Sequence, residues 1–373
     1  MKGKIRILFL IDTISGPNGG TEKHVLELID HLDQSKFQIY LGCLYQSQWL
    51  KDHAPACPQI TLNFKGYWHP NFIWQVIKLV RFLKKENVQI LQTFFLEANI
   101  IGMISTKFAK VPWTIASRRN IGHRNTPFKT QVLKFLSSAT TAYLANCQKV
   151  KQVVIDQERV DPQKVRVIYN GVDPDRFSPG HSSTRAKLGL PEGKLIVGMV
   201  ANLKKIKGID FFLEAAGKIT HKRRDVLFVI IGGEYEEEYY LNLRDNMGLK
   251  ETVLFLGIKK DIEDYLRAFD VAINSSLTEG FSNSILEYMA SGLAVVATDV
   301  GGNAEAVVDG QTGLIVPAAD SEKLAEAIQN LLADKKLRRD MGEKGREKIL
   351  ANFTQEKMIR ELEEFYLGLA HAF

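Results

Sequence analysis

The sequence lacks several features that would place it in other classes of protein. Its 373 residues include only three cysteines, Cys43, Cys57 and Cys147, which are widely spaced and odd in number. They match neither a zinc site nor a disulfide framework, so we expect a reducing cytosol. No stretch approaches the roughly 18 apolar residues that span a membrane. The apolar run in MKGKIRILFLIDT is too short for a signal peptide and indicates a first buried strand.

The sequence also lacks a dinucleotide-binding motif and has only one formal match to a metal-binding motif. No properly spaced G-x-G follows the first strand of either half, which argues against a dehydrogenase. Asp173-Pro174-Asp175 formally matches the D-x-D signature of metal-dependent sugar transferases. Proline between two aspartates in a glycine-rich segment is typical of a turn, so we expect a turn there and no metal site.

The amount and distribution of charge suggest two domains with different surroundings. A chain of 373 residues exceeds what one hydrophobic core usually serves. Residues 1–172 hold 23 Lys and Arg against 11 Asp and Glu, a balance of +12, whereas the rest holds 26 against 32, a balance of −6. The first half is therefore expected to meet an anionic partner, either a membrane surface or a phosphorylated acceptor. A basic solvated face without a partner is the alternative.

Continuous apolar runs alternate with amphipathic segments along both halves, which predicts two α/β domains with parallel sheets covered on both faces. In the first half the predicted strands are Ile5–Ile11, Phe37–Cys43, Val88–Gln92, Trp113–Ser117, Ala142–Asn146 and Val165–Tyr169, with helices at Thr21–Leu32, 72–85 and 97–109. In the second half the predicted strands are Leu195–Ala201, Val226–Ile231, Val253–Phe255, Val271–Asn274 and Ala294–Thr298. The predicted helices of this half lie near 208–220, 236–247, 261–268, 284–291, 320–333, 336–351 and 354–370. We assign domains to residues 1–172 and 193–352, a linker to 173–192, and a last helix to 353–373.

The most specific stretch is Glu279-GFSNSIL-Glu287, directly after a predicted strand. We expect Glu279 in the loop and Glu287 on the following helix, whose N-terminal N–H groups and dipole would hold a diphosphate. The two carboxylates would accept hydrogen bonds from sugar and ribose hydroxyls. The alternative is a capping box formed by Ser284 and Glu287, in which the carboxylate only satisfies backbone donors.

This stretch resembles the acidic-x7-acidic motif of glycosyltransferase family 4, and the resemblance covers essentially the whole chain. It includes GPNGGTEKH after the first strand, NGVDPDRF in the linker, ANLKKIKG, and GLAVVATDVGGNAEAVVDGQTGLIVP. The family implies the GT-B fold, in which two Rossmann-like domains face each other across a cleft and a C-terminal helix crosses back to the first domain. The first domain would bind the acceptor and the second the nucleotide sugar, with no cofactor and no metal.

The resemblance also implies roles for individual residues. Glu279 would hold donor-sugar hydroxyls and Glu287 the ribose, while Lys207 would neutralise the leaving diphosphate. Further donor contacts would come from Gly19, Gly20, Lys204, Gly280, Phe281 and Ser282. Breaking a sugar–diphosphate bond creates negative charge, which a preorganised lysine and helix-end amides stabilise.

The chain departs from the family pattern at two places. Asn202 stands where many members have an arginine, so Lys204 or Lys205 would supply the second positive charge of the donor site. Many members also carry a first-domain histidine where this chain reads SRRNIGHRN, which makes Ser117, Arg118, Arg119 and His123 candidates for acceptor or phosphate contact. For His24 we expect packing rather than phosphate contact.

Two basic amphipathic stretches bear on the acceptor. Trp74-QVIKLVRFLKK is expected to be an ordinary sheet-covering helix with its lysines in water. Residues 126–137, TPFKTQVLKFLS, are expected to make surface or acceptor contact.

Together these observations predict a retaining glycosyltransferase that moves a sugar from a nucleotide sugar to a hydroxyl acceptor in surface polysaccharide or glycolipid synthesis. UDP is the preferred nucleotide, with GDP left open, and front-face attack would use the leaving phosphate as base. The acceptor would be a glycan or lipid-linked, no nucleic acid is expected, and the enzyme would be cytoplasmic with peripheral contact at the inner face of an anionic membrane. The alternatives are a nucleotide-sugar 2-epimerase and a non-catalytic nucleotide-sugar-binding partner subunit.

Overall fold

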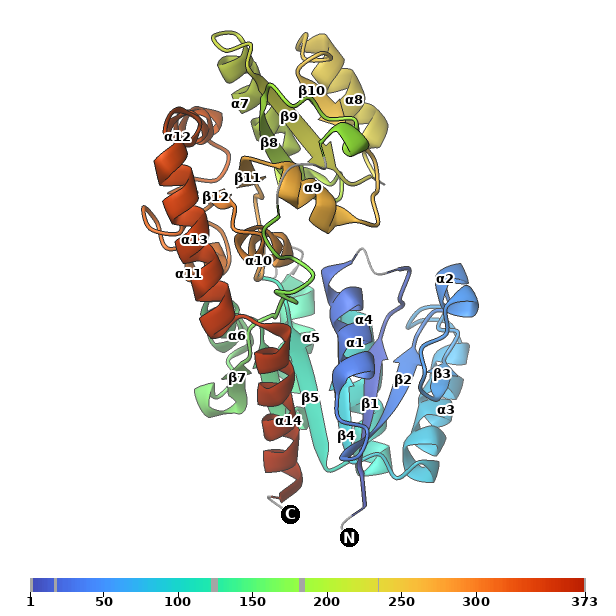
Figure 1. Cartoon of the computed structure of the whole chain (residues 1–373). Helices are drawn as coiled ribbons and strands as arrows, with labels where there is room; N and C mark the ends of the chain where they lie inside the picture. Colours follow the sequence, from blue (N-terminus) through green and yellow to red (C-terminus); the bar gives the residue numbers. More distant parts are fainter. Residues whose placement is uncertain (1–2, 17–18, 122–126, 181–184, 234, 372–373) are drawn as a thin grey trace. The chain divides into compact units, whose positions relative to one another are not determined.

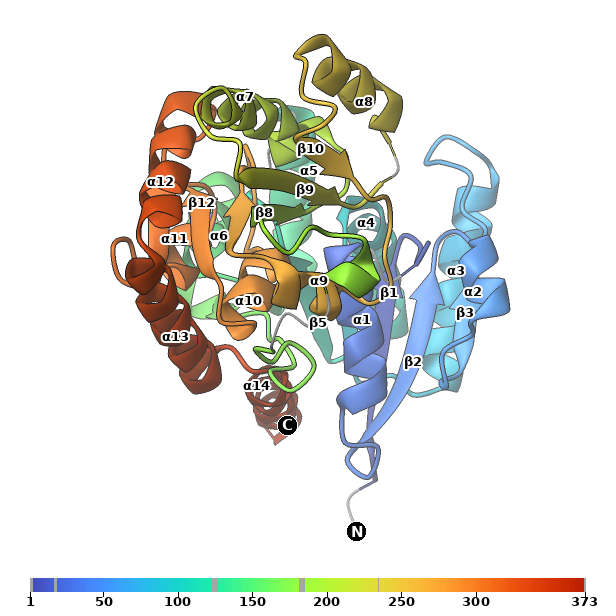
Figure 2. The same ribbon diagram turned by 45° about the horizontal axis from the view of Figure 1, so that its top comes forward.

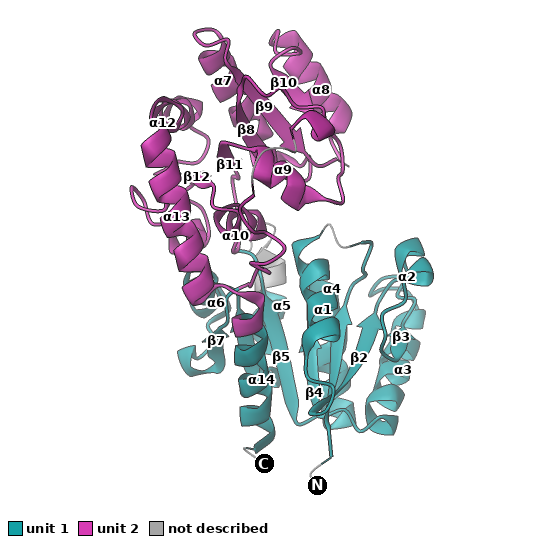
Figure 3. Cartoon of the chain, in the orientation of Figure 1, with its two compact units in different colours: residues 1–169, 358–373 teal, residues 170–357 magenta. Residues whose placement is uncertain are grey.

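The chain folds into two units, each built on one parallel sheet. A computed structural model describes residues 3–16, 19–121, 127–180, 185–233 and 235–371. Unit 1 comprises residues 1–169 and 358–373, and unit 2 comprises residues 170–357 (Figure 3). Within the described residues, no helix is both long and apolar enough to cross a membrane.

Unit 1 contains a seven-stranded sheet in the order β3-β2-β1-β4-β5-β6-β7 (Figure 1). Its strands are β1 (Ile5–Ile11), β2 (Phe37–Cys43), β3 (Gln59–Thr61), β4 (Ile90–Thr93), β5 (Trp113–Arg118), β6 (Ala142–Ala145) and β7 (Val165–Val167). The helices are α1 (Gly20–His31), α2 (Gln48–Asp52), α3 (Asn71–Lys85), α4 (Leu96–Ala109), α5 (Pro127–Leu136) and α6 (Gln148–Glu158). Ile7 pairs in parallel register with Ile39 of β2 and Ile90 of β4, so three apolar runs from distant parts of the sequence form the centre of the sheet.

The C-terminal helix α14 (Gln355–His371) completes the core of unit 1. Met358, Ile359, Leu362 and Tyr366 are buried in the same cluster as the strands. The Tyr366 hydroxyl donates a 2.6 Å hydrogen bond to Oε1 of Gln92 on β4. The predicted return of the last helix to the first domain is therefore confirmed.

Unit 2 contains a six-stranded parallel sheet in the order β10-β9-β8-β11-β12-β13, and Figure 2 shows β8, β9 and β10 side by side. Its strands are β8 (Leu195–Val200), β9 (Val226–Ile231), β10 (Val253–Phe255), β11 (Val271–Asn274), β12 (Ala294–Thr298) and β13 (Gly313–Val316). The helices are α7 (Ile209–Thr220), α8 (Glu237–Asn246), α9 (Ile262–Ala268), α10 (Asn283–Ala290), α11 (Asn303–Ala306), α12 (Ser321–Ala333) and α13 (Lys335–Asn352).

The elements absent from the sequence-based prediction are mostly short. The strands β3 and β13 and the helices α2 and α11 have five residues or fewer, too few for a clear periodic pattern. The longer α6 was also missed. Its mixed sequence, QKVKQVVIDQE, buries only Val150, Val154 and Glu158.

The segment expected to be a linker packs on unit 2 where it is described. Nη2 of Arg185 lies 2.8 Å from Oδ2 of Asp270, and Arg176 pairs with Glu263 at 3.0 Å. Oδ1 of Asp173 accepts hydrogen bonds from the backbone N–H groups of Asp175 and Arg176 at 3.0 and 3.2 Å. Asp173-Pro174-Asp175 therefore forms the turn that the sequence predicts, with one aspartate bound to its own backbone.

Candidate nucleotide-sugar site

The candidate residues of unit 2 lie in loops that follow the carboxyl ends of its central strands. The loop after β8 carries Asn202, Lys204 and Lys207, and the loop after β11 carries Glu279–Ser282. The strands β8 and β11 are neighbours in the sheet, so these loops emerge side by side. In open parallel sheets this edge is where ligands bind.

Lys207 and Glu279 form an ion pair, although 72 residues separate them in the sequence. Nζ of Lys207 lies 2.6 Å from Oε1 of Glu279, and the hydroxyl of Ser276 donates to the same oxygen at 2.7 Å. The two side chains are 25% and 12% exposed, so the pair is partly withdrawn from water but still accessible. An ammonium and a carboxylate in this position can bind a phosphate oxygen and a sugar hydroxyl, respectively.

Glycines allow these loops to approach each other. Gly208, which directly precedes α7, has a φ of +63°, and a Cβ there would lie 2.0 Å from the carbonyl oxygen of Ser275. Gly301 has a φ of +55°, and a Cβ there would lie 2.3 Å from the carbonyl oxygen of Glu279. Only glycine combines positive φ with such close backbone contact. Gly208 therefore fixes the lysine loop, and Gly301 fixes the loop of Glu279.

Glu287 lies on α10 as a nearly buried side chain, 8% exposed. The helix begins at Asn283 with Ser282 as its N-cap, so Ser284 is the second helical residue and Glu287 the fifth. A capping box requires the serine at the N-cap and the glutamate three residues later. The capping-box alternative is therefore wrong.

Tyr288, the residue after Glu287 on α10, bonds this helix to the end of β8. Its hydroxyl accepts a 2.7 Å hydrogen bond from the backbone N–H of Val200. Burial, together with the negative charges of Glu287 and Glu279, raises the pKa of Tyr288. The hydrogen bond from Val200 ties the helix that carries Glu287 to the sheet edge of the candidate site.

Three asparagines support the loop of Glu279 through side-chain hydrogen bonds, and none of them was predicted from the sequence. Asn170 donates from Nδ2 to the carbonyl oxygen of Phe281 at 3.0 Å and to Oδ1 of Asn283 at 2.7 Å. Asn303 donates to Oδ1 of Asn274 at 3.2 Å, and Asn274 donates to Oγ of Ser282 at 3.1 Å. Their signal was available, since Asn170 opens NGVDPDRF and Asn274 ends a buried strand.

Lys204, Asn202 and Lys205 lie in the same loop as Lys207, and the contacts described for them are with residues other than Glu279. Lys204 sets its ammonium 3.7 Å from the ring centroid of Tyr235, a cation–π contact. Asn202 lies in the same loop, where its carbonyl oxygen accepts from the N–H of Lys204 at 2.7 Å. Lys205 and Lys207 both lie in the short 3-10 helix η4 (Lys205–Lys207).

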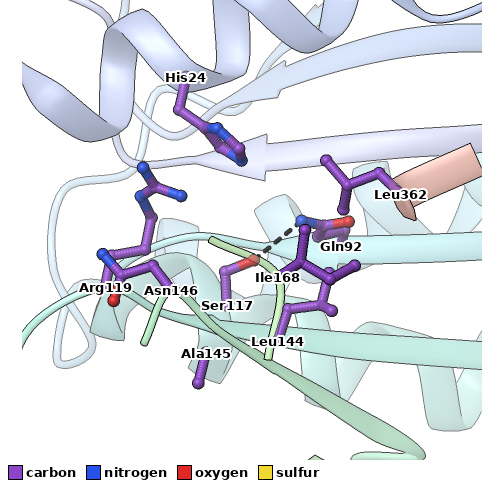
Figure 4. Close-up of a pocket in the computed structure, with 9 residues that line it drawn as sticks. All are labelled: His24, Gln92, Ser117, Arg119, Leu144, Ala145, Asn146, Ile168 and Leu362. Atoms are coloured by element: carbon purple, nitrogen blue, oxygen red, sulfur yellow. Dashed lines mark hydrogen bonds between the residues drawn. The ribbon is translucent and has the colours of Figure 1, made fainter. Parts of the chain in front are cut away.

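Unit 1 has a small polar cavity of about 20 Å³ at the carboxyl ends of its central strands (Figure 4). It is lined by His24, Gln92, Ser117, Arg119, Leu144, Ala145, Asn146, Ile168 and Leu362. Nε2 of Gln92 donates to Oγ of Ser117 at 2.9 Å. The volume suffices for a water molecule among polar partners. Burial lowers the pKa of Arg119 to about 10, and burial together with the Arg119 charge holds the pKa of His24 well below its usual value.

The remaining first-domain candidates have different positions. Arg118 forms a bidentate pair with Glu158 at 2.8 and 2.9 Å and lies over the ring of Tyr143, so its guanidinium is occupied by structural partners. Gly19 and Gly20 stand at the N-terminus of α1. His123 lies outside the described residues. Of the four acceptor candidates, the structure therefore brings Ser117 and Arg119 together at one cavity.

Comparisons with known proteins identify the family of the chain. The family described as "Glycosyltransferase Family 4" matches residues 18–176, and "Glycosyl transferases group 1" matches residues 181–348. The UDP-Gal:alpha-D-GlcNAc-diphosphoundecaprenol alpha-1,3-galactosyltransferase of Escherichia coli is 28% identical over 94% of both chains. The lipopolysaccharide core biosynthesis mannosyltransferase LpcC of Rhizobium leguminosarum bv. viciae is 34% identical over 54% of this chain and 59% of its own.

Solved structures share the fold at low sequence identity. A glycosyltransferase from Rickettsia africae superposes with a TM-score of 0.87 at 22% identity, covering 98% of this chain and 99% of its own. Anabaena Alr3699/HepE in complex with UDP gives a TM-score of 0.85 at 21% identity, covering 98% and 100%. Two Rossmann-like units of this kind are the GT-B fold, and the protein is a GT-B glycosyltransferase. The chain belongs to glycosyltransferase family 4.

Proposed function

We propose that the enzyme transfers a sugar, with retention of anomeric configuration, from a UDP-sugar to a hydroxyl of a glycan or lipid-linked acceptor. The observation that carries the proposal is the Lys207–Glu279 pair at the sheet edge of unit 2, with Glu287 on the helix that follows the loop of Glu279. The UDP named in the E. coli relative and bound in the Anabaena structure supports the choice of nucleotide.

Each side chain of the site has a distinct chemical task in this reaction. Glu279 and Glu287 accept hydrogen bonds from hydroxyls of the transferred sugar and of the ribose, respectively. Lys207 and the N-terminal N–H groups of α10 stabilise the negative charge that develops on the diphosphate. Gly280, Phe281 and Ser282 approach the sugar and phosphates with their backbone.

Retention follows when the acceptor attacks the face from which the diphosphate leaves. The bond between the anomeric carbon and the phosphate oxygen breaks as the acceptor oxygen bonds to the same carbon. The acceptor hydroxyl passes its proton to the departing phosphate oxygen. This chemistry uses the donor's own phosphate as base and needs no cofactor.

The acceptor side of the proposal rests on unit 1. Ser117 and Arg119 line its polar cavity beside His24, and Arg119 supplies a positive charge suited to a phosphate or carboxylate of the acceptor. The basic balance of the first half suits an enzyme that works in the cytoplasm, peripherally at an anionic membrane carrying a lipid-linked acceptor.

Calorimetry with UDP, GDP and ADP tests the donor site. We expect UDP to bind best, and Glu287→Gln to weaken it by about 10- to 100-fold, because a hydrogen bond to a charged group contributes about 1.5–3 kcal/mol. Glu343→Gln is the matched control, since Glu343 is exposed on α13. If no nucleotide bound, or if both variants bound equally, the assignment of the donor site would be wrong. Release of an epimerised nucleotide sugar without acceptor would replace transfer by epimerisation.

A further inference from the structure

One side of helix α3 packs into unit 1, and its opposite side exposes large apolar residues. Leu79 and Leu83 are buried on the inner side, where α3 packs against α4. On the outer side Ile73 and Trp74 are 64% and 65% exposed. Trp68, in the turn directly before the helix, is fully exposed at 100%. The expectation that this helix is an ordinary sheet-covering helix holds only for its inner side.

The composition of the outer side is unusual. At about 100° per residue, its residues fall within an arc of about 140°. We call this arc together with Trp68 the α3 face, and its members are Trp68, Ile73, Trp74, Ile77, Lys78, Arg81, Lys84 and Lys85. The helix from Asn71 to Lys85 contains no Asp or Glu at all. The α3 face therefore combines only large apolar and positively charged side chains.

Such a combination matches the surface of an anionic bilayer better than water or an acidic protein. Exposed apolar groups of this size mark a surface that meets a partner. Tryptophan prefers the boundary between lipid headgroups and acyl chains, and the stems of Lys and Arg bury while their charges reach lipid phosphates. Tryptophans also serve protein–protein interfaces, but a face with four basic and no acidic side chains suits the continuous negative charge of an anionic membrane surface.

We propose that the α3 face binds the surface of an anionic lipid bilayer, with Trp68, Ile73 and Trp74 entering the interface and the basic side chains contacting headgroup phosphates. The proposal rests on the membrane contact of the proposed function and gives it a location. Each basic residue near an anionic surface contributes about a factor of five to binding. Four basic residues and two tryptophans can therefore hold the enzyme on the membrane reversibly.

Sedimentation of the full chain with vesicles tests the proposal. We expect binding to phosphatidylcholine vesicles that contain phosphatidylglycerol, little binding to phosphatidylcholine alone, and a blue shift of tryptophan fluorescence. Arg81→Gln/Lys84→Gln/Lys85→Gln should weaken binding about 100-fold at low salt. Trp68→Ser/Trp74→Ser should weaken it at every salt concentration and abolish the blue shift.

Matched controls come from α13 of unit 2. Lys335→Gln/Lys336→Gln/Lys344→Gln removes three exposed charges, and Leu350→Ser removes an apolar side chain that is 49% exposed. Both should bind vesicles like the unchanged enzyme. UDP calorimetry on every variant shows that the donor site is folded and separates a failed donor site from a failed membrane surface. Equal binding to neutral and anionic vesicles, no vesicle binding, or full binding by both α3 variants would overturn the proposal.

Discussion

At the scale of single residues, the site depends on a lysine and a glutamate that hold each other in place. Lys207 and Glu279 are 2.6 Å apart, and Ser276 donates to the same carboxylate oxygen. Their partial burial lowers the local screening by water, so the lysine charge acts more strongly on a nearby phosphate. Lys204, two residues past Asn202, instead lies over Tyr235.

This difference predicts unequal effects of removing the two lysines. Lys207→Ala should lower turnover about 10²- to 10³-fold, because a preorganised group that stabilises developing charge contributes on that order. Lys204→Ala should change it far less. Turnover is followed as release of the nucleoside diphosphate at saturating donor. A larger loss in Lys204→Ala would mean that the second lysine carries the diphosphate.

At the scale of elements, tight turns rather than helices position the loop of Glu279. Gly301 and Gly302 form the turn after β12, where the N–H of Gly302 donates to the carbonyl oxygen of Gly280 at 2.7 Å. Asn170 donates a hydrogen bond to the carbonyl oxygen of the next residue, Phe281. The centroid of the Phe281 ring lies 5.4 Å from the centroid of the Phe353 ring. The loop of Glu279 is thus fixed through its backbone on several sides.

A pair of glycine substitutions separates backbone strain from this packing. Gly301→Ala and Gly310→Ala both force alanine into positive φ, at +55° and +70°. A Cβ at Gly310 meets nothing within 4 Å, whereas one at Gly301 meets the Glu279 carbonyl at 2.3 Å. We expect Gly310→Ala to cost about 1–2 kcal/mol and to keep UDP affinity. Gly301→Ala should lose UDP affinity at least tenfold, measured by calorimetry; equal affinities would show that the turn does not position the loop.

At the scale of the whole molecule, the chain forms two units, and unit 1 is assembled from two separate stretches of sequence, residues 1–169 and 358–373. Unit 1 is completed by residues from α14, and Leu362 lines its cavity together with His24. His24 packs edge-on against Phe94 and is buried, so the folded unit favours the neutral imidazole.

Burial of His24 predicts a loss of stability in acid. Its folded pKa lies below the unfolded value of about 6.5, so the unfolded chain binds more protons below that pH. Stability should fall as pH drops below about 6.5, by up to about 1.4 kcal/mol per pH unit from this group. Urea unfolding between pH 8 and 5 should show a smaller decline in His24→Phe than in the unchanged enzyme. In the control His53→Gln, which replaces an exposed histidine, stability should decline with falling pH as much as it does in the unchanged enzyme. An unchanged slope in His24→Phe would exclude His24 as the source.

The sequence by itself determined the two parallel sheets and the motif of the candidate donor site. The strand β9 is a continuous apolar run, and β1 and β2 are each interrupted by a single charged or amide side chain, so local pattern reveals these strands without knowledge of their neighbours. The motif Glu279-x7-Glu287 is likewise local, and it identified the loop and helix that carry the two carboxylates.

Only the tertiary structure decided which of these residues meet. Lys207 pairs with Glu279 across 72 residues of sequence, and Asn170 bonds to the carbonyl oxygen of Phe281 across 111 residues. No local sequence pattern encodes contacts between positions so far apart. Arg118 and Arg119 are adjacent in sequence, yet one pairs with Glu158 and the other lines the cavity. The sequence did not predict the exposure of Trp74 either. Hydrophobic periodicity shows that a helix carries an apolar residue at a position, but it does not show whether another element covers that residue.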